Sequence, residues 1–329
     1  FKGDLIWTLL TTMAELKGHE EKAGFSRPLG AKHGHGKDRK TWREERDDEI
    51  AELGHTKQPY VVIIGGGQGG IALGARLKQL GVPTIIIEKN ERPGDSWRKR
   101  YKSLCLHDPV WYDHLPYIDF PKNWPVFTPK DKMGDWLEMY TRVMELNYWV
   151  AAKCISAAYD EAEKVWTVVV DRVGQRVTLK PKHIVFATGA YGPPRRIELP
   201  GVDSFKGELL HSSQYPTGEK FRGKRVAVIG AASSGHDVSV DLWEAGAKVT
   251  MVQRSPTTVV KSDTLMDVGF EIFSEKALAR GITTDKADMI VASTPFALVP
   301  KGQRALYDVI RARDADFYTR LSDSGFAID

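Results

Sequence analysis

Three glycines follow an apolar run near residue 60, in a spacing that suits nucleotide binding. Val61–Ile64 is apolar and β-branched, and Gly65, Gly67 and Gly70 come directly after it. The first glycine permits a tight turn, the second lets the backbone approach a pyrophosphate, and the third lets a helix pack closely on the strand. The spacing therefore predicts a dinucleotide-binding turn. The alternative is a glycine-rich turn in an ordinary α/β unit.

The flanking residues form the elements that such a turn needs. Small and apolar residues recur at helical spacing over 71–80, and a second apolar run over 84–87 ends on Glu88. The N-terminus of the helix offers unpaired N–H groups and a partial positive charge to phosphates. An acid at the end of the second strand can hydrogen-bond a ribose hydroxyl. We expect Gln68, in the first helical turn, and Lys89, beside the acid, to belong to the same site.

The same pattern returns near residue 225. A strand is expected over 225–229, a helix to residue 245, and a second strand over 248–253. Ala232 stands where a second glycine is expected, but alanine adds one methyl group and still permits close approach. The residues of this second turn that we expect to bind a nucleotide are Gly230, Ser233, Ser234 and Gly235.

The second unit ends differently from the first. Arg254 and Ser255 follow its second strand, in the place where an acid would hold a free ribose hydroxyl. Arginine pairs bidentately with phosphate oxygens, so it suits the 2′-phosphate of NADP. We therefore expect FAD or NAD at the first turn and NADP at the second. The alternative is that Arg254 is a surface charge.

Composition narrows the classes of function. The length of 329 residues favours two domains, and 42% hydrophobic with 27% charged residues allow a sizeable core. The net charge of +4, without a basic stripe interleaved with aromatics, does not indicate nucleic-acid binding. No run approaches the roughly 18 apolar residues of a membrane helix. The chain begins at Phe1 without a signal-peptide pattern, which favours a fragment or a processed chain.

Cysteine and histidine usage restricts redox and metal chemistry. The two cysteines, Cys105 and Cys154, are far apart in the sequence. This arrangement favours a reducing, cytoplasmic location and argues against a dithiol redox centre. His33 and His35 lack a carboxylate or cysteine at a ligand spacing, so a solvated linker is preferred to a metal site.

Periodicity predicts further elements along the chain. Apolar residues predict a packing helix over 1–23, on a face made of Leu5, Ile6, Leu9, Leu10, Met13 and Leu16. Residues 24–57 are polar and favour a linker. Other helices are expected over 130–147, 285–292 and 304–326. Strands are expected over 154–159, 165–170 and 176–179, as an antiparallel meander, and over 183–187.

Residues 104–127 form a stretch rich in proline and aromatic side chains, too irregular for a helix or a strand. A long loop of this kind can line the binding site of a flat cofactor. The alternative is a loop folded on its own side chains.

Five motifs together carry a family resemblance. They are the first glycine turn, the segments 94–101, 186–189 and 205–215, and the second glycine turn with Arg254. From about residue 59 onward the chain resembles the flavin-containing monooxygenases, in the group that includes the plant YUCCA enzymes and their fungal relatives. After Arg254 we find no third unit of strand and Ala-Thr-Gly. In this family the chain returns to complete the FAD domain, so we expect this chain to stop before the return.

The resemblance implies tightly bound FAD, NADPH as hydride donor, and a flavin hydroperoxide that uses O2 to oxygenate a small nucleophilic or keto-acid substrate. It also implies a catalytic role for His107, at the position where other members carry an asparagine near the flavin. The alternative is that His107 fixes the loop by bonding a backbone carbonyl. Further cofactor contacts are implied for Ser96, Trp97, His107, Asp108, Thr188 and Gly189.

These observations predict an α/β protein with two dinucleotide-binding, Rossmann-like units, a small antiparallel meander and an N-terminal helical extension. The expected divisions are 1–58 for the helix and linker, 59–200 for an incomplete FAD-binding domain, and 201–329 for an NADPH-binding domain. Two alternatives to the monooxygenase stay open. One is an NADPH-dependent flavin reductase or dehydrogenase without oxygenation, and the other is an inactive nucleotide-binding remnant.

Overall fold

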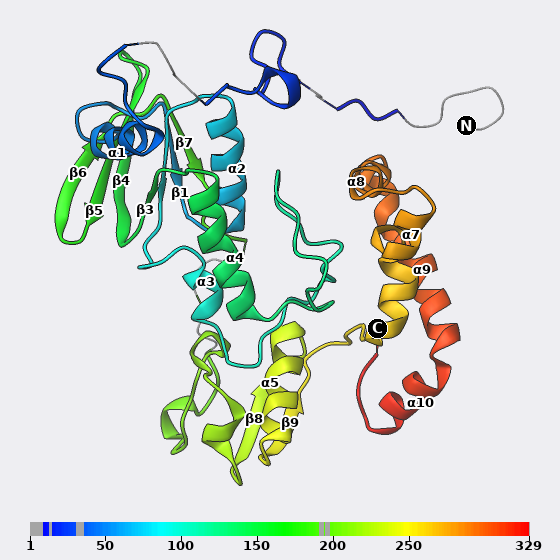
Figure 1. The fold of residues 1–329 in the computed structure, drawn as a ribbon. Helices are drawn as coiled ribbons and strands as arrows, with labels where there is room; N and C mark the ends of the chain where they lie inside the picture. Colours follow the sequence, from blue (N-terminus) through cyan, green and yellow to red (C-terminus); the bar gives the residue numbers. More distant parts are fainter. Residues whose placement is uncertain (1–8, 13–14, 31–35, 191–193, 195–197, 329) are drawn as a thin grey trace.

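The protein has an α/β fold with a parallel sheet and a small antiparallel three-stranded sheet (Figure 1). The computed structural model describes residues 9–12, 15–30, 36–190, 194 and 198–328.

The parallel sheet is built around a short apolar strand. Its strands lie in the order β3-β2-β1-β7, and neighbouring strands are parallel. Their bounds are β1 Val61–Ile64, β2 Thr84–Ile87, β3 Tyr148–Trp149 and β7 His183–Phe186. Both faces of β1 are covered, which explains why its side chains are apolar without interruption.

Alternate side chains of β1 enter two different cores, as the period of a strand requires. Val61 and Ile63 pack with α2 (Gln68–Gln79) and α4 (Lys130–Val143). Val62, which is fully buried, faces the opposite side. There it packs with the antiparallel meander, which confirms the expected three strands: β4 Ala152–Asp160, β5 Val165–Arg172 and β6 Gln175–Leu179.

The helix expected over residues 1–23 is wrong for the part that the structure describes. Residues 9–12 and 15–23 contain no helix, while Leu5, Ile6 and Met13 lie outside the described residues. Leu9 and Leu16 remain 78% and 42% exposed. An apolar stripe without a surface to pack against does not stabilise a short helix in water.

The linker expected over residues 24–57 is wrong in its second half, where α1 spans Trp42–Glu52. Thr41 and Glu44 form a capping box at its N-terminus. Arg46, which is buried, donates to the Asn147 side chain at 2.7 Å and to the Leu146 carbonyl at 2.9 Å. Polar contacts therefore hold this helix, so hydrophobic periodicity did not predict it. His33 and His35 lie outside the described residues.

The second unit has the expected strand–helix–strand order. β8 (Arg225–Ile229) and β9 (Lys248–Val252) pair in parallel, and α5 (Ser233–Glu244) connects them. Val238 and Leu242 of α5 pack in one apolar cluster with Tyr101 and Leu104, which follow the first unit's helix α3 (Asp95–Arg98). The second unit therefore shares a core with the chain that leaves the first.

The end of the described chain is helical. The helix expected over 285–292 is confirmed, but the single helix expected over 304–326 is wrong: the structure has one helix that ends at Arg313 and a second that begins at Ala315. The helices of this end lie beside the aromatic stretch 104–127 and apart from the sheets (Figure 1). Tyr112 of that stretch packs edge-to-face on Phe270 and Phe273. Within the described residues no helix has the length and apolar character needed to cross a membrane. The helices are α6 Ser262–Thr264, α7 Glu275–Ala279, α8 Thr284–Ala292, α9 Val299–Arg313 and α10 Ala315–Asp323.

Candidate functional site

The turn between β1 and α2 is crowded at three glycines and leaves open space at two others. A Cβ at Gly66 would lie 2.0 Å from the Tyr148 hydroxyl oxygen. Gly65 has a φ of +113°, and a Cβ there would lie 2.3 Å from the Ala187 carbonyl oxygen. A Cβ at Gly70 would lie 2.0 Å from the Gly65 carbonyl oxygen. At Gly67 and Gly69 a Cβ would meet no protein atom within 4 Å. The turn is therefore packed on the protein side and open on the side where a pyrophosphate would approach.

Glu88 closes β2 and holds this turn in place. Its Oε2 accepts the backbone N–H of Gly66 at 2.9 Å, and its Oε1 accepts the backbone and side-chain N–H groups of Asn90. The Tyr148 hydroxyl donates to the Gly66 carbonyl at 2.6 Å, and burial raises the pKa of Tyr148, so this donor stays protonated. Lys89, the next residue, is exposed. The ribose contact expected of Glu88 stays a prediction.

Other residues expected at the first site meet at the same edge of the sheet. Trp97 of α3 donates its indole N–H to the Gln68 side chain at 3.3 Å. The backbone N of Thr188 lies 3.2 Å from the Cβ position of Gly65. Ser96 and Gly189 are exposed neighbours of these two contacts along the chain. Segments from three parts of the sequence therefore surround one turn.

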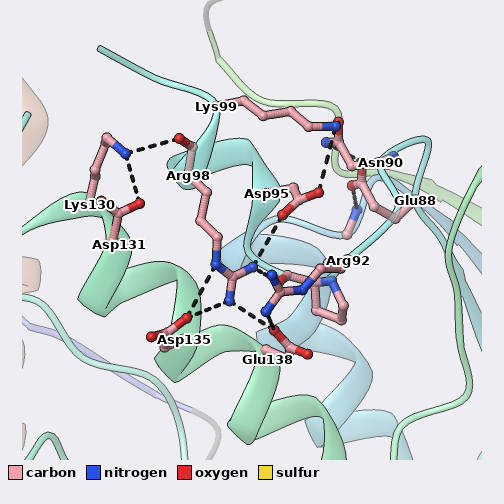
Figure 2. A network of polar contacts seen from close by, with 12 residues as sticks. Glu88, Asn90, Arg92, Asp95, Arg98, Lys99, Lys130, Asp131, Asp135 and Glu138 are labelled. Atoms are coloured by element: carbon pink, nitrogen blue, oxygen red, sulfur yellow. Dashed lines mark hydrogen bonds and ion pairs between the residues drawn. The ribbon is translucent and has the colours of Figure 1, made fainter. Parts of the chain in front are cut away.

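A guanidinium that is mostly shielded from solvent fixes α3 against α4 (Figure 2). Arg98, which is 14% exposed, forms ion pairs with Asp95 at 3.2 Å and with Asp135 and Glu138 of α4 at 2.9 Å each. It also donates to the Pro93 carbonyl at 2.7 Å. The pKa of Arg98 is raised, because hydrogen bonds and charges from these carboxylates outweigh its burial.

The substitution Arg98→Met is expected to destabilise the protein. It leaves Asp95, whose side chain is 10% exposed, without its main counter-ion. Breaking such a buried pair costs about 3–5 kcal/mol. The measurement is the free energy of unfolding in urea. Arg142→Met is the matched control, because Arg142 also pairs with Glu138 but is 77% exposed, and it should cost less than about 1 kcal/mol. An equal loss in the free energy of unfolding of the two variants would contradict the role assigned to Arg98.

The turn between β8 and α5 repeats the backbone of the first turn. Gly230 has a φ of +115°, and a Cβ at Gly235 would lie 2.2 Å from the Gly230 carbonyl oxygen. Ala232 is the residue before α5, and Ser233 and Ser234 are the first two residues of the helix. Replacing the second glycine by alanine therefore leaves the strand–turn–helix geometry intact.

Arg254 and Ser255 follow the end of β9, and both are exposed. The parallel pairing of β8 and β9 places their carboxyl ends at one edge, so Arg254 and the glycine turn emerge on the same side. Arg254 forms no ion pair with the described part of the chain. Its guanidinium is therefore available to an anionic ligand.

His107 lies at the start of the aromatic stretch, and it contacts the second unit rather than the first turn. Its Nε2 is 2.8 Å from Oδ2 of Asp237 in α5, so its partner is a carboxylate and not a backbone carbonyl. The Tyr101 hydroxyl donates to the same oxygen at 2.5 Å. Asp108 follows His107 and is exposed. The sequence analysis missed Asp237, because nothing in its spacing marks a contact that depends on packing between distant segments.

The aromatic stretch makes two kinds of contact. Phe120 stacks on Trp124 at 4.8 Å, so part of the stretch is folded on its own side chains. The part nearer His107 borders a cavity of about 340 Å³ against α8. Burial and then nearby Asp108 raise the pKa of Asp113 in this cavity to about 7. The cavity is lined by Tyr112, Asp113, His114, Phe273, Asp288, Val291 and Ala292.

Metal and disulfide chemistry find no support in the described residues. No group of three or more His, Cys, Asp or Glu side chains within them is arranged to hold a metal ion. Cys105 and Cys154 are both free thiols, and burial raises the pKa of each.

Comparison with known proteins agrees with the two glycine turns. Residues 62–294 match the family model described as pyridine nucleotide-disulphide oxidoreductase. Indole-3-pyruvate monooxygenase YUCCA1 of Oryza sativa subsp. japonica is 37% identical over 210 residues, 64% of this chain and 51% of the relative. The probable indole-3-pyruvate monooxygenase YUCCA10 of Arabidopsis thaliana is 30% identical over 267 residues, 80% of this chain and 67% of the relative.

The chain belongs to the flavin-containing monooxygenase family. A solved flavin-containing monooxygenase from Stenotrophomonas maltophilia is 26% identical, with a TM-score of 0.58 and 68% of each chain covered. A structure of OTEMO in complex with FAD and NADP is 27% identical, with a TM-score of 0.52, over 66% of this chain and 44% of the other. This chain spans about half the length of the first curated relative it matches.

Proposed function

We propose that this protein is an FAD- and NADPH-dependent monooxygenase that oxygenates a small nucleophilic or keto-acid substrate with O2. The observation that carries the proposal is the repetition of one glycine turn in one chain. Gly65 and Gly230 share a φ near +114°, and Gly70 and Gly235 both lie against the carbonyl of that first glycine. Two such turns bind two nucleotides, as hydride transfer from NADPH to a flavin requires.

The residues present fit FAD at the first turn and NADP at the second. The open side of Gly67 and Gly69, with Glu88 at the end of β2, suits a pyrophosphate and its ribose. The exposed guanidinium of Arg254 suits a 2′-phosphate. On this basis we assign residues 59–200 to the FAD unit and 201–329 to the NADPH unit. Bound FAD would take hydride from NADPH and react with O2.

His107 is the residue of this chain that we assign to oxygenation. Its imidazole can donate an N–H hydrogen bond near neutral pH, and such donors stabilise charge that develops during reaction. The loop that carries it also borders the cavity at Asp113, which has room for a small substrate.

The test of the function uses the purified 329-residue chain. We expect flavin absorbance after purification, NADPH oxidation that depends on O2, and an oxygenated organic product. NADPH oxidation that releases only hydrogen peroxide with every substrate tried would favour the flavin reductase. A chain that binds neither flavin nor NADPH after addition of both would favour the inactive remnant.

The substitution His107→Ala is expected to keep FAD content and hydride transfer but to release several-fold more hydrogen peroxide per NADPH consumed. The physical reason is that the substitution removes an N–H donor. Without its hydrogen bond the oxygenation step is slower. The measurements are a peroxide assay and stopped-flow absorbance of flavin reoxidation. His55→Ala, which removes an exposed histidine beside Trp149, is the control and should change neither. Unchanged coupling in His107→Ala would make His107 a structural residue.

A further inference from the structure

Two segments far apart in the sequence meet at one carboxylate of helix α5. Asp237 Oδ2 lies 2.8 Å from His107 Nε2 and accepts the Tyr101 hydroxyl at 2.5 Å. His107 belongs to the aromatic stretch, Tyr101 to the segment after α3, and Asp237 to the second unit. A single oxygen atom therefore joins the histidine assigned to oxygenation to the helix that begins at the second glycine turn.

Asp237 is held more firmly than the histidine it contacts. One turn further along α5, Asp241 accepts the Tyr215 hydroxyl at 2.5 Å and the backbone N–H of Gly218 at 2.7 Å. Between these two acids, Val238 packs in the apolar cluster that includes Tyr101. His107 lies in irregular chain, and its side chain is 48% exposed. The helix therefore sets the position of the carboxylate, and the carboxylate sets the orientation of the ring.

We infer that Asp237 is a positioning residue that keeps a proton on Nε2 of His107 and leaves Nδ1 as the nitrogen that exchanges a proton. This inference rests on the proposed function of His107. A carboxylate that accepts from one ring nitrogen selects the tautomer protonated at that nitrogen, which leaves the other nitrogen as the one that can exchange a proton. In the protonated ring this other nitrogen carries the N–H that we assign to oxygenation. No covalent bond changes in this step, because Asp237 only holds the proton that Nε2 carries.

The carboxylates around His107 favour its protonated form. The hydrogen bond to Asp237 raises the pKa of His107, and the charges of Asp237 and of Asp108 add to this, against opposing effects of burial and of Arg100. On the other side of the pair, hydrogen bonds from His107 and Tyr101 lower the pKa of Asp237 despite its burial, with a smaller effect from the neighbouring His236. Cys105, close to Asp237, has a raised pKa and stays a neutral thiol.

The raised pKa of His107 and the lowered pKa of Asp237 make the stability of the protein depend on pH. Stability from the raised pKa of His107 is present below its unfolded value near 6.5 and is lost as the pH rises through the folded pKa. Stability from the lowered pKa of Asp237 is present above its unfolded value near 3.8 and is lost as the pH falls through the folded pKa. The pair therefore stabilises the protein most between about pH 4 and 6.5.

The first experiment is a pH titration of the full chain with 15N-labelled histidine, which requires no bound flavin. The signals of His107 are assigned from their loss in His107→Ala. We expect a pKa above 6.5, and above that pKa the chemical shifts of the Nε2–H tautomer. The Nδ1–H tautomer in the unsubstituted protein would overturn the inference, even if no variant of Asp237 folds.

Two variants separate the charge from the shape of the contact. Asp237→Asn keeps an oxygen that can accept from Nε2 but removes the negative charge, so the pKa of His107 should fall. The difference in melting temperature from the unsubstituted protein should be widest between about pH 4 and 6.5. Tyr101→Phe removes only the second hydrogen bond to Oδ2 and should leave the pKa of His107 raised. An unchanged pKa in Asp237→Asn would overturn the inference.

A parallel activity measurement links the contact to the reaction. The pH profile of peroxide release per NADPH should shift to lower pH in Asp237→Asn, in step with the pKa of His107. A shifted pKa with an unshifted profile would overturn the positioning role. Failure of the unsubstituted protein to oxygenate any substrate, with the titration as expected, would instead count against the proposed function.

Discussion

The substitution Gly67→Val is expected to abolish FAD binding while the chain still folds. A Cβ at this position meets no protein atom within 4 Å, so the branched side chain has room in the protein without ligand. The space it fills is the space through which a pyrophosphate would approach the backbone N–H groups of α2. We expect the affinity for FAD to fall at least about 100-fold, which corresponds to about 2.8 kcal/mol.

Flavin absorbance after purification and a titration with FAD measure this effect. Gly302→Val is the matched control, because Gly302 lies in α9 and also has open space around its Cβ position, and it should bind FAD normally. Gly70→Ala should instead lower the melting temperature, because its Cβ would lie 2.0 Å from the Gly65 carbonyl oxygen. A Gly67→Val protein with normal flavin content would remove the first turn from the cofactor site.

The substitution Arg254→Ala is expected to abolish most of the preference for NADPH over NADH. Its guanidinium is exposed at the carboxyl end of β9, beside the second glycine turn. One charge-assisted contact to the 2′-phosphate contributes about 1.5–3 kcal/mol, so the ratio of the two dissociation constants should change about ten- to a hundred-fold. NADH lacks that phosphate, and its affinity should stay constant.

Binding of the two nucleotides is measured by titration at one fixed ionic strength, because phosphate contacts are screened by salt. Arg225→Ala is the control, since Arg225 is exposed at the opposite end of β8 and should leave the ratio unchanged. A constant ratio in Arg254→Ala would mean that another residue recognises the phosphate.

The sequence predicted best those elements that apolar patterning creates. In the parallel sheet β1, β2 and β7 are confirmed, as is the meander, because their side chains alternate between, or fill, two cores. The two-residue strand β3 was not predicted, because it is too short to show a pattern. Apolar patterning did not predict correctly the elements whose formation depends on a packing surface or on polar contacts. Leu9 and Leu16, the described members of the expected N-terminal stripe that are exposed, enter no core. Helix α1 is held by Arg46 through contacts to residues about one hundred positions away.

In the candidate site, too, some residues could be predicted from the sequence and others could not. Glycine turns can be predicted because the steric requirement at Gly65 and Gly70 is local to a few residues. The contact of His107 with Asp237 depends on how the aromatic stretch packs on α5, and the pairing of Arg98 with Asp135 depends on how α3 packs on α4. Both contacts join residues that no short motif connects, so only the three-dimensional structure identifies them.

The position of β1 in the sheet also determines the order in which the protein can be assembled. One partner, β2, follows after a single helix, but the other partner, β7, follows only after the whole meander has been synthesised. Closing so long a loop is entropically costly, so this pairing forms late. Until then Val61–Ile64 presents an unpaired apolar edge, which is a template for aggregation. A low temperature during expression weakens hydrophobic association between such edges and should therefore raise the yield of folded chain.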